Sequence, residues 1–444
     1  MIVKNFDKPV TFLKGGVHPS HRKELTSGKP IEVCPLPDSV TIPLQQHIGA
    51  PCKSIVEKGQ EVKAGQKIGE SDAYCHSPVH SSVNGTVKSI GPQLHTCGLK
   101  IEAIVIDVNK EDDAVEKLKP LDNDAQPEDI IKRVKDAGLA GMGGAAFPTH
   151  VKLSPPKEKP IETVLINGCE CEPYITCDHR QMLEMSDELV DGLKLIMKAV
   201  SAKRAYIGIE DNKRDAIVVL REKTKAYDNI GVAALVAKFP QGSEKQLIEA
   251  VSNKQVPSGG LPADVGYLVQ NVGTTIAIHK AVREGLPLIE RAVTVSGEGV
   301  KVPKNLLVRL GTPIDHLLKV AGGLVGEYNS IIAGGPMTGF VQTSLDAPII
   351  KGTSGVTVLP QKEIKKMVPD PCIKCATCVG ACPIGLLPLR IKAFAEKSIF
   401  EELEELNVMD CIECGCCSYV CPARIPLVHW IRYSKLKLKE RNNE

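Results

Sequence analysis

Two cysteine runs near the end of the 444-residue chain constrain its fold and chemistry more than any other feature. The runs are Cys372-x2-Cys375-x2-Cys378-x3-Cys382-Pro383 and Cys411-x2-Cys414-x2-Cys417-x3-Cys421-Pro422. In chains that hold two [4Fe–4S] clusters with this spacing, the fourth cysteine of each run ligates the cluster of the other run. The pattern therefore predicts one cluster on Cys372, Cys375, Cys378 and Cys421, and a second on Cys411, Cys414, Cys417 and Cys382.

Two other uses of these cysteines are a structural zinc site and disulfides. A zinc site needs only four ligands and lacks the cysteine–proline pair that ends both runs. A disulfide scaffold suits a short secreted chain, whereas eight of the sixteen cysteines here stand in cluster spacing. We therefore expect iron–sulfur clusters in a reducing cell interior. Cys416 does not disturb its run, because Cys417 keeps the spacing.

Composition argues against several classes of function. The net charge is +2 and aromatic residues make up 4% of the chain, so nothing indicates nucleic-acid binding. The apolar fraction of 43% is that of an ordinary globular protein. The sequence shows no signal peptide and no run near the roughly 20 apolar residues that span a bilayer. We therefore expect that partner proteins hold the chain at any membrane where it works.

The N-terminal quarter of the chain is predicted to be mostly β-structure. Residues 1–30 are predicted to form an ordered surface arm, and short strands with close turns follow over 31–110. This region is similar to the barrel-sandwich domains that carry biotin or lipoate on a lysine at a hairpin tip. No lysine lies between Lys67 and Lys88, so we expect a scaffolding or docking role instead.

A glycine-rich stretch follows an acidic linker over 111–126 and a helix predicted from Pro127 to Gly138. The stretch is Gly138-Leu-Ala-Gly141-Met-Gly143-Gly144-Ala-Ala-Phe147-Pro148-Thr149. Its glycines let backbone N–H groups approach an anionic or planar ligand closely, although a flexible loop can have the same composition. It is not the G-x-G-x-x-G dinucleotide motif, because no strand directly precedes it. Lys152 follows at a distance that can reach a phosphate.

Strands and helices then alternate, as in an open α/β sheet. The polar runs that follow the strands are Asn167-Gly-Cys169-Glu170-Cys171-Glu172-Pro173-Tyr174, the loop with Gly242 and Ser243 at a helix start, the glycine loop 256–262, and Gln270-Asn271-Val-Gly273-Thr274. Ligands bind at the carboxyl ends of such strands, and helix starts suit phosphates. These loops together predict a nucleotide or flavin site. Cys169, Cys171 and Cys177 are free thiols or, alternatively, a metal site.

The remaining segments complete a multidomain α/β protein. Strands and a short helix over 290–350 predict a β-grasp domain, and the 28 residues between the cysteine runs are predicted to be helical. We therefore expect an arm and a β barrel-sandwich hybrid at 1–115, a Rossmann-like flavin and NADH core at 125–287, a β-grasp domain of the SLBB type at 288–358 and an α-helical two-cluster ferredoxin domain at 362–435.

The ligand loops resemble those of the FMN- and NADH-binding subunit of respiratory complex I. That family has a glycine-rich stretch ending in Gly-Phe-Pro-Thr with a lysine five residues after the Phe, an Asn-x-Asp-Glu-x-Glu-Pro run and an Asn-Asn-Val-Glu-Thr run. The resemblance implies FMN held by Gly141, Gly143, Lys152, Asn167, Asn271 and Thr274, with Phe147, Glu170 and Glu172 facing NADH as candidate catalytic residues. Gly144, Glu170, Gly242 and Ser243 complete the candidate cofactor-binding set. This chain departs from the family at Cys169 and Gly273, where acidic residues are usual.

Over roughly residues 1–435 the order of modules is similar to the RnfC family, which belongs to the Rnf ion-translocating ferredoxin:NAD oxidoreductase complex. Gly-Gly-Val-His-Pro at 15–19, Cys-Glu-Pro-Tyr at 171–174 and Val-Pro-Ser-Gly-Gly-Leu-Pro at 256–262 carry this likeness. It implies one component of a translocase, peripheral on the cytoplasmic side of the bacterial cell membrane, that moves electrons between NAD(H), FMN and two [4Fe–4S] clusters. The implied partners are the membrane subunits and the ferredoxin-like subunit of that complex.

Two alternatives remain open from the sequence. One is a cobalamin reductase, or a proline-reductase electron donor, built on the same modules. The other is a ferredoxin-type electron carrier without a working flavin site.

Overall fold

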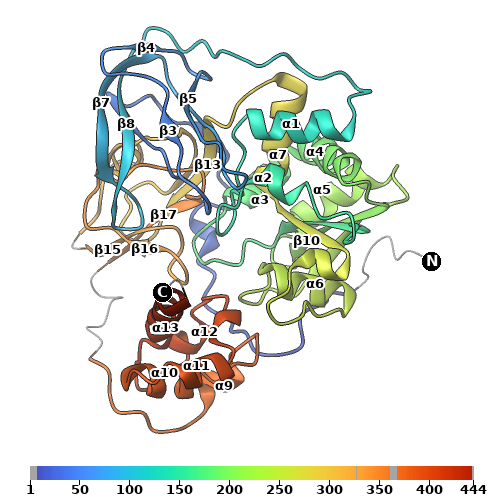
Figure 1. Cartoon of the computed structure of the whole chain (residues 1–444), viewed down its shortest axis with the longest axis vertical. Coiled ribbons are helices and arrows are strands. Elements are labelled where there is room, and N and C mark those ends of the chain that lie inside the picture. The colour runs from blue at the N-terminus through green and yellow to red at the C-terminus, as the bar shows by residue number, and fades with distance from the viewer. Residues whose placement is uncertain (1–7, 327, 361–367, 443–444) are drawn as a thin grey trace.

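The computed structural model describes residues 8–326, 328–360 and 368–442 of the chain. Residues 1–7 of the expected arm and residue 362, the expected start of the ferredoxin domain, lie outside the described residues. A β-rich domain, an α/β core, a second β-domain and a helical C-terminal domain follow one another in the predicted order (Figure 1).

The α/β core is built on a four-stranded parallel sheet with the strand order β11-β10-β9-β12. Its strands are β9 (Thr163–Gly168), β10 (Arg204–Glu210), β11 (Ile230–Leu235) and β12 (Tyr267–Asn271). The chain runs outward from β9 to β11 and then returns to place β12 on the other side of β9. This reversal of strand order is a topological switch point, where open α/β sheets bind ligands beyond the carboxyl ends of their strands.

The helices of this core follow the predicted alternation with strands. They are α1 (Pro127–Asp136), α2 (Thr149–Lys152), α3 (Cys177–Glu184), α4 (Ser186–Ala199), α5 (Arg214–Thr224), α6 (Glu244–Ser252), α7 (Val272–His279), η2 (Pro262–Val265) and η3 (Lys280–Glu284). The predicted helix start at Pro127 is confirmed, and Gln126 and Asp129 form a capping box there. Gly138 lies just beyond the helix with a φ of +66°, which glycine adopts without strain.

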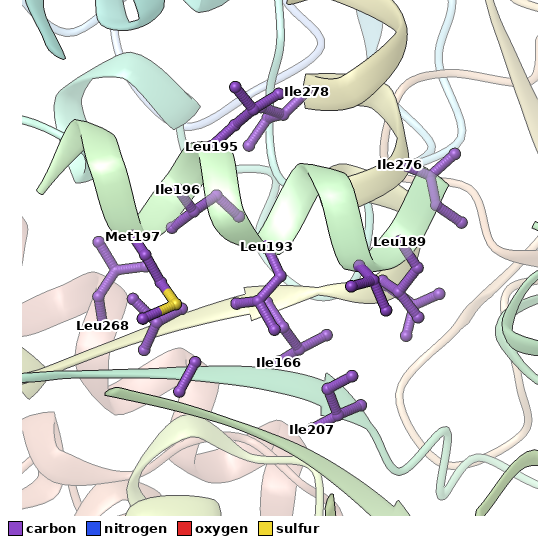
Figure 2. Packing of buried hydrophobic residues seen from close by; sticks show 14 of the residues in the cluster. Ile166, Leu189, Leu193, Leu195, Ile196, Met197, Ile207, Leu268, Ile276 and Ile278 are labelled. Atoms are coloured by element: carbon purple, nitrogen blue, oxygen red, sulfur yellow. The ribbon is translucent and has the colours of Figure 1, made fainter. Parts of the chain in front are cut away.

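The hydrophobic core of this domain lies between α4 and the sheet (Figure 2). Leu189, Leu193 and Ile196 occupy one face of α4, as the spacing i, i+4, i+7 requires. All three are fully buried, as are Ile166 on β9 and Ile207 on β10. Burying a side chain of this size stabilises the fold by about 1.5–3 kcal/mol, so this layer fixes the sheet that carries the ligand loops.

Two small antiparallel sheets form the predicted barrel-sandwich domain. One has the order β2-β8-β7-β4 and the other the order β3-β5-β6. Their strands are β2 (Ser39–Pro43), β3 (Lys53–Ser54), β4 (Glu61–Val62), β5 (Lys67–Glu70), β6 (Val79–His80), β7 (Gly85–Leu94) and β8 (Lys100–Val108). Val40, Ile68 and Ile104 are fully buried in the common core of the two sheets.

The second β-domain is a six-stranded sheet with the order β1-β14-β13-β17-β15-β16 and one helix, α8 (Ile314–Val320). Its strands are β1 (Ile31–Val33), β13 (Glu290–Ser296), β14 (Lys304–Arg309), β15 (Tyr328–Ala333), β16 (Phe340–Val341) and β17 (Gly355–Pro360). Residues 31–33 fall in the segment predicted as the barrel-sandwich domain, and in the structure they add a strand to this sheet. β1 pairs in parallel with β14, and such a distant partner leaves no local signal in the sequence.

The C-terminal domain is helical, as predicted for the cluster-binding region. It contains α9 (Thr377–Gly380), α10 (Pro388–Glu396), α11 (Glu401–Glu405), η5 (Val408–Asp410), α12 (Cys416–Tyr419) and α13 (Leu427–Asn442). Ile391, Leu403 and Ile431 are buried in its core. The short helices α9 and α12 each follow the second cysteine of a run, so the helical core holds both cysteine runs in place.

Over its described residues, the arm before β1 is ordered and mostly exposed or half-exposed, as predicted, but some of its residues are inserted between domains. Val10 forms a bridge to Leu235 at the edge of the parallel sheet, and Phe12 is buried. Farther on, Gly16 N donates to Ala381 O of the helical domain at 3.0 Å, and Val17 exchanges hydrogen bonds with Phe239. The arm has no apolar period that sequence analysis can read, because successive residues contact different domains.

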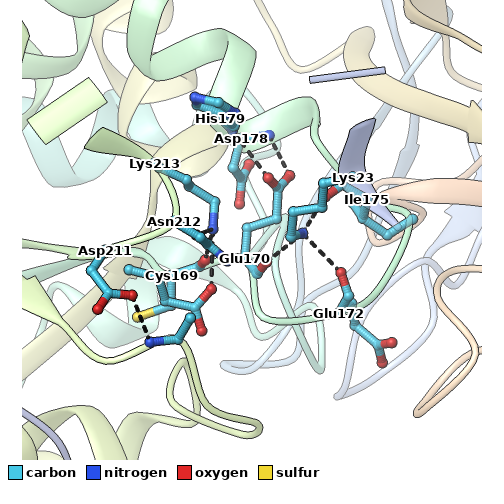
Figure 3. Close-up of polar contacts among 12 residues, drawn as sticks. Lys23, Cys169, Glu170, Glu172, Ile175, Asp178, His179, Asp211, Asn212 and Lys213 are labelled. Atoms are coloured by element: carbon cyan, nitrogen blue, oxygen red, sulfur yellow. Dashed lines mark hydrogen bonds and ion pairs between the residues drawn. The ribbon is translucent and has the colours of Figure 1, made fainter. Parts of the chain in front are cut away.

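Lys23, in the short helix η1 (Lys23–Leu25), attaches the arm to the α/β core (Figure 3). Its Nζ donates to the carbonyl oxygens of Glu170 at 2.8 Å, Glu172 at 2.9 Å and Ile175 at 2.5 Å. The residue is 8% exposed, and burial lowers the pKa of its ammonium group. One buried side chain therefore satisfies three carbonyls of the loop that follows β9.

We predict that Lys23→Met destabilises the chain, because it leaves up to three buried carbonyl oxygens without a donor, at about 1–3 kcal/mol each. Equilibrium unfolding in urea measures the change. Lys14→Met is the matched control, since Lys14 lies in the same arm and is exposed. Equal stability of the two variants would show that these hydrogen bonds do not hold the arm.

Candidate functional site

The eight cysteines of the two runs line two separate pockets. One pocket contains Cys372, Cys375, Cys378 and Cys421, and the other contains Cys382, Cys411, Cys414 and Cys417. Each run therefore contributes its fourth cysteine to the pocket of the other run, the grouping that the spacing predicts. The remaining lining is mainly apolar, with Leu389 and Ile425 in one pocket and Leu386 and Ile431 in the other. Four thiols in an apolar pocket are the donor set of a [4Fe–4S] cluster, so these residues fit that group.

The two runs share a backbone conformation as well as a spacing. Residues on either side of the second cysteine have positive φ in both runs: Lys374 and Ala376 in the first, Glu413 and Gly415 in the second. Such turns aim backbone N–H groups inward, and Glu413 N donates to Cys411 Sγ at 3.3 Å. Leu386 N donates to Cys382 Sγ at the same distance. Donors to the sulfur atoms tune the potential of a bound cluster.

The two pockets differ in their exposure. Cys372 and Cys375 are exposed, whereas none of the cysteines of the second pocket is exposed. Burial raises the pKa of Cys411 to about 11 and, with the nearby Cys414, that of Cys417 to about 12. These thiols therefore stay protonated near neutral pH until a metal binds and displaces the protons. We call the two sites the exposed pocket and the buried pocket.

A small apolar cluster joins the buried pocket to the α/β core. Val17, Phe239, Ala381 and Cys416 are buried in it, and Cys171 and Cys414 pack against them. Cys416 Sγ lies 3.8 Å from the Phe239 carbonyl oxygen. The additional cysteine of the second run thus contacts the α/β core, and it also lines the buried pocket beside Cys414 and Cys417.

The predicted glycine loop lies over the start of α7. Ala140 and Pro148 close the loop as an isolated bridge, and Gly141 N donates to Phe147 O at 2.9 Å. Met142 N donates to Thr274 Oγ1 at 2.9 Å. A Cβ on Gly143 would lie 2.7 Å from Asn271 Nδ2, so only glycine permits this approach.

The asparagines predicted at the strand ends meet at the switch point. Asn167 at the end of β9 is the register partner of Asn271 at the end of β12. Asn167 Nδ2 donates to Gly242 O at 2.6 Å, and Asn271 Oδ1 caps α7 by accepting from Thr274 N at 3.2 Å. The structure thus brings these four candidate cofactor-binding residues together at one edge of the sheet.

The candidate phosphate-binding residues meet at the start of α6. The Lys152 ammonium pairs with the carboxylate of Glu244, the first residue of that helix, and is partly exposed. Ser243 is the N-cap residue, and Gly242 precedes it. A helix N-terminus beside a lysine suits an anion, which here competes with Glu244 for the ammonium group.

Open, unsatisfied groups in this region fit a flavin mononucleotide. A Cβ on Gly144 would meet no atom within 4 Å, and one on Gly141 would meet none closer than 3.5 Å. Thr149 Oγ1 is buried and has no hydrogen-bond partner among the described residues. Phe147 is 37% exposed. The loop therefore offers free backbone, an unpaired hydroxyl and an exposed ring.

The 169–175 loop directs its two glutamates to different places (Figure 3). Glu170 accepts from Asp178 N at 2.6 Å and His179 N at 3.2 Å, which satisfies the first turn of α3. Glu172 accepts from Met337 N at 3.1 Å and from the Thr338 hydroxyl, both in the connection from β15 to β16. Burial raises the pKa of Glu172. The structure therefore does not bring these two predicted NADH contacts together.

Cys169, Cys171 and Cys177 have three different surroundings. Cys169 is buried in a hydrophobic cluster with Leu235, Cys171 packs toward the helical domain, and Cys177 Sγ donates to Ser354 O at 3.3 Å. Burial raises the pKa of Cys171 to about 12. The alternative of a metal site made by these three cysteines finds no support in this arrangement.

Sequence reasoning missed several charged residues around this loop. Lys213 is fully buried, and its Nζ donates to Cys169 O at 2.6 Å and to Glu210 Oε2 at 3.1 Å. Asp178 accepts from Asn271 Nδ2 at 2.6 Å. Arg291 is buried and donates to Met142 O at 3.1 Å. A single lysine, aspartate or arginine that belongs to no motif cannot be recognised from the sequence as a site residue.

Four family models match successive parts of the chain. They are the RnfC barrel sandwich hybrid domain over residues 11–111, the Nuo51 FMN-binding domain over 134–280, the SLBB domain over 292–341 and the 4Fe-4S dicluster domain over 371–425. Within the described residues, no helix combines the length and apolar character needed to cross a membrane. The four matches confirm the predicted fold class.

Curated relatives match almost the whole chain. The RnfC-type component of the proton-translocating ferredoxin:NAD(+) oxidoreductase complex of Clostridium ljungdahlii is 46% identical over 95% of this chain and 93% of its own length. Its counterpart in the Na(+)-translocating ferredoxin:NAD(+) oxidoreductase complex of Acetobacterium woodii is 43% identical over 96% of each chain. A solved NAD+-reducing [NiFe]-hydrogenase is 22% identical over 63% of this chain and 54% of its own, with a TM-score of 0.49. The chain belongs to the RnfC family of the ion-translocating ferredoxin:NAD(+) oxidoreductase complexes.

Proposed function

We propose that the chain is the NADH-oxidising and NAD-reducing electron-input subunit of a membrane-bound ion-translocating ferredoxin:NAD oxidoreductase. In this role it exchanges a hydride between NAD(H) and FMN and single electrons with two [4Fe–4S] clusters. The observation that carries the proposal is the combination, in one chain, of a ligand loop at a switch point with two pockets of four cysteines. The membrane subunits and the ferredoxin-like subunit of the complex are its partners, and it is peripheral on the cytoplasmic side.

The proposed FMN site consists of the residues at the switch point. Bound FMN supplies the chemistry that joins a two-electron donor to one-electron clusters. Gly141, Gly143 and Gly144 admit the flavin close to the backbone, Lys152 with Gly242 and Ser243 binds its phosphate, and Asn167, Glu170, Asn271 and Thr274 orient it. The free space at Gly141 and Gly144 and the unpaired Thr149 hydroxyl support this assignment.

The proposed NADH contacts lie around the exposed edge of the glycine loop. Phe147 offers an apolar ring to the nicotinamide or the adenine, and Glu170 is the nearer of the two predicted carboxylates to α3 and the flavin loop. Glu172 reaches NADH only if it releases Met337 and Thr338, so its contact depends on a movement of the connection between β15 and β16.

The two pockets give the clusters different tasks. The buried pocket adjoins the apolar cluster that contacts the 169–175 loop, so its cluster is the first to exchange electrons with the flavin. The exposed pocket places Cys372 and Cys375 at the surface, where its cluster exchanges electrons with partner proteins. The proposed division into domains at 1–115, 125–287, 288–358 and 362–435 places the flavin in the second unit and both clusters in the last.

We predict that Gly141→Ala weakens FMN binding at least about tenfold, or about 1.4 kcal/mol. The added Cβ has room in the protein itself, since its nearest neighbours are 3.5 Å away, but it occupies space next to the proposed flavin. Equilibrium binding of FMN to the purified chain measures the change. Gly28→Ala is the control, because a Cβ on Gly28 has room as well, with nothing within 4 Å, and Gly28 lies outside the proposed flavin site. Unchanged FMN affinity in Gly141→Ala would place the flavin elsewhere.

We predict that Cys382→Ser and Cys375→Ser, both changes in the first cysteine run, affect different clusters. Cys382→Ser should alter the electron paramagnetic resonance signal of the buried-pocket cluster, as Cys414→Ser does, because Cys382 and Cys414 line the same pocket. Cys375→Ser should alter the signal of the other cluster. If each run instead held its own cluster, Cys382→Ser and Cys375→Ser would change the same signal.

A further inference from the structure

Two partly buried carboxyl groups lie side by side next to the proposed flavin site. One carboxylate oxygen of Glu170, one of Asp178 and the Sγ of Cys177 all lie within 4.8 Å of one another. The carboxylate of Glu170 accepts a hydrogen bond from the backbone N–H of Asp178, which holds the two residues next to each other. Asp178 Oδ2 accepts from Asn271 Nδ2 at 2.6 Å, and Asn271 in turn contacts Gly143 of the glycine loop. One hydrogen bond therefore connects the carboxyl pair to a residue at the flavin site.

The surroundings of Asp178 disfavour the ionised form of its carboxyl group. Burial, and after it the charge of Glu170, raise the pKa of Asp178 to about 7, while the Asn271 amide and the cations of Arg291 and Lys213 act in the opposite direction. Arg291 comes from β13, and Lys213 lies just before α5. A carboxyl group this close to a second carboxylate is harder to ionise, so Asp178 keeps its proton until the pH exceeds the raised value.

The amide of Asn271 can respond to this proton in only one way. Its Oδ1 is fixed by the bond from Thr274 N at the start of α7, so Nδ2 must remain the donor to Asp178. Loss of the proton makes Asp178 a charged acceptor, which strengthens this bond and adds negative charge beside the loop. Reduction adds electrons to the flavin, so this negative charge makes a flavin at this position harder to reduce.

We propose that Asp178, beside the Glu170 carboxylate, holds one exchangeable proton next to the flavin site, and that Asp178 is a positioning residue that couples the flavin potential to pH through Asn271. The second half of this inference rests on the proposed function, because it requires FMN at the switch point. The first half concerns the chain alone and is tested without a flavin.

Infrared spectroscopy of the full-length chain tests the proton directly. We expect a C=O stretching band of a protonated carboxyl that disappears as the pH rises through about 7, and no such band that titrates near this pH in Asp178→Asn. Asp215→Asn is the matched control, since Asp215 is a half-exposed aspartate that pairs with His179. It should retain the band. Absence of a band that titrates near neutral pH in the wild-type chain, or its persistence in Asp178→Asn, overturns the proposal.

The stability of the chain gives a second readout with a defined sign. A carboxyl whose pKa rises from 3.8 unfolded to about 7 folded binds more protons in the folded state, so it lowers the stability progressively as the pH rises between those values. Asp178→Asn should lack this part of the pH dependence, and Glu170→Gln should reduce it by removing the neighbouring charge. Identical pH profiles in urea unfolding for the wild type and Asp178→Asn overturn the proposal.

The flavin potential tests the coupling. In the wild-type chain with bound FMN, the dependence of the potential on pH should change slope near the pH at which the infrared band titrates. Asp178→Asn should bind FMN and lack that change. Equal slopes in both proteins overturn the coupling, whereas a wild-type chain that binds no FMN but shows the titrating band refutes the proposed function and leaves the carboxyl pair standing.

Discussion

Two buried ammonium groups hold the 169–175 loop, and the arrangement of the four domains depends on this contact. Lys23 donates to three carbonyls of the loop and Lys213 to a fourth, that of Cys169. A buried charge without such partners is strongly unfavourable, so each lysine fixes the backbone that surrounds it. The loop has positive φ at Glu170 and Tyr174, conformations that persist only where neighbouring structure maintains them. Loop, arm and sheet therefore stabilise one another.

The same loop contacts three other parts of the molecule, which explains how distant sites are positioned together. Glu170 satisfies the start of α3 beside the glycine loop, Cys171 packs toward the buried pocket, and Glu172 binds the connection from β15 to β16. One short segment thus contacts both the proposed flavin site and the buried pocket. In the proposed path, electrons then leave the chain at the exposed pocket, where Cys372 and Cys375 are exposed.

The sequence predicted the chemistry better than the contacts between domains. The grouping of the cysteines into two pockets could be predicted because it follows from a local spacing that occurs twice. Asn167 and Asn271 could be predicted because ligands bind at the carboxyl ends of parallel strands, where both residues lie. The contacts of the arm with two domains and the pairing of β1 with β14 were missed, since both depend on partners that are distant in the chain. Lys23 and Lys213 were missed for a related reason: burial, which gives these residues their role, leaves no period or motif around a single charged residue.

The most direct test of the proposed electron path is an anaerobic titration of the purified chain, reconstituted with FMN and iron–sulfur clusters, with NADH. Optical absorbance follows the flavin, and electron paramagnetic resonance follows the two clusters. We expect bleaching of the flavin followed by signals from two [4Fe–4S] clusters, with the flavin required for both. Clusters that form but are not reduced by NADH in a chain that retains FMN would contradict the proposed path from the switch point through the buried pocket to the surface.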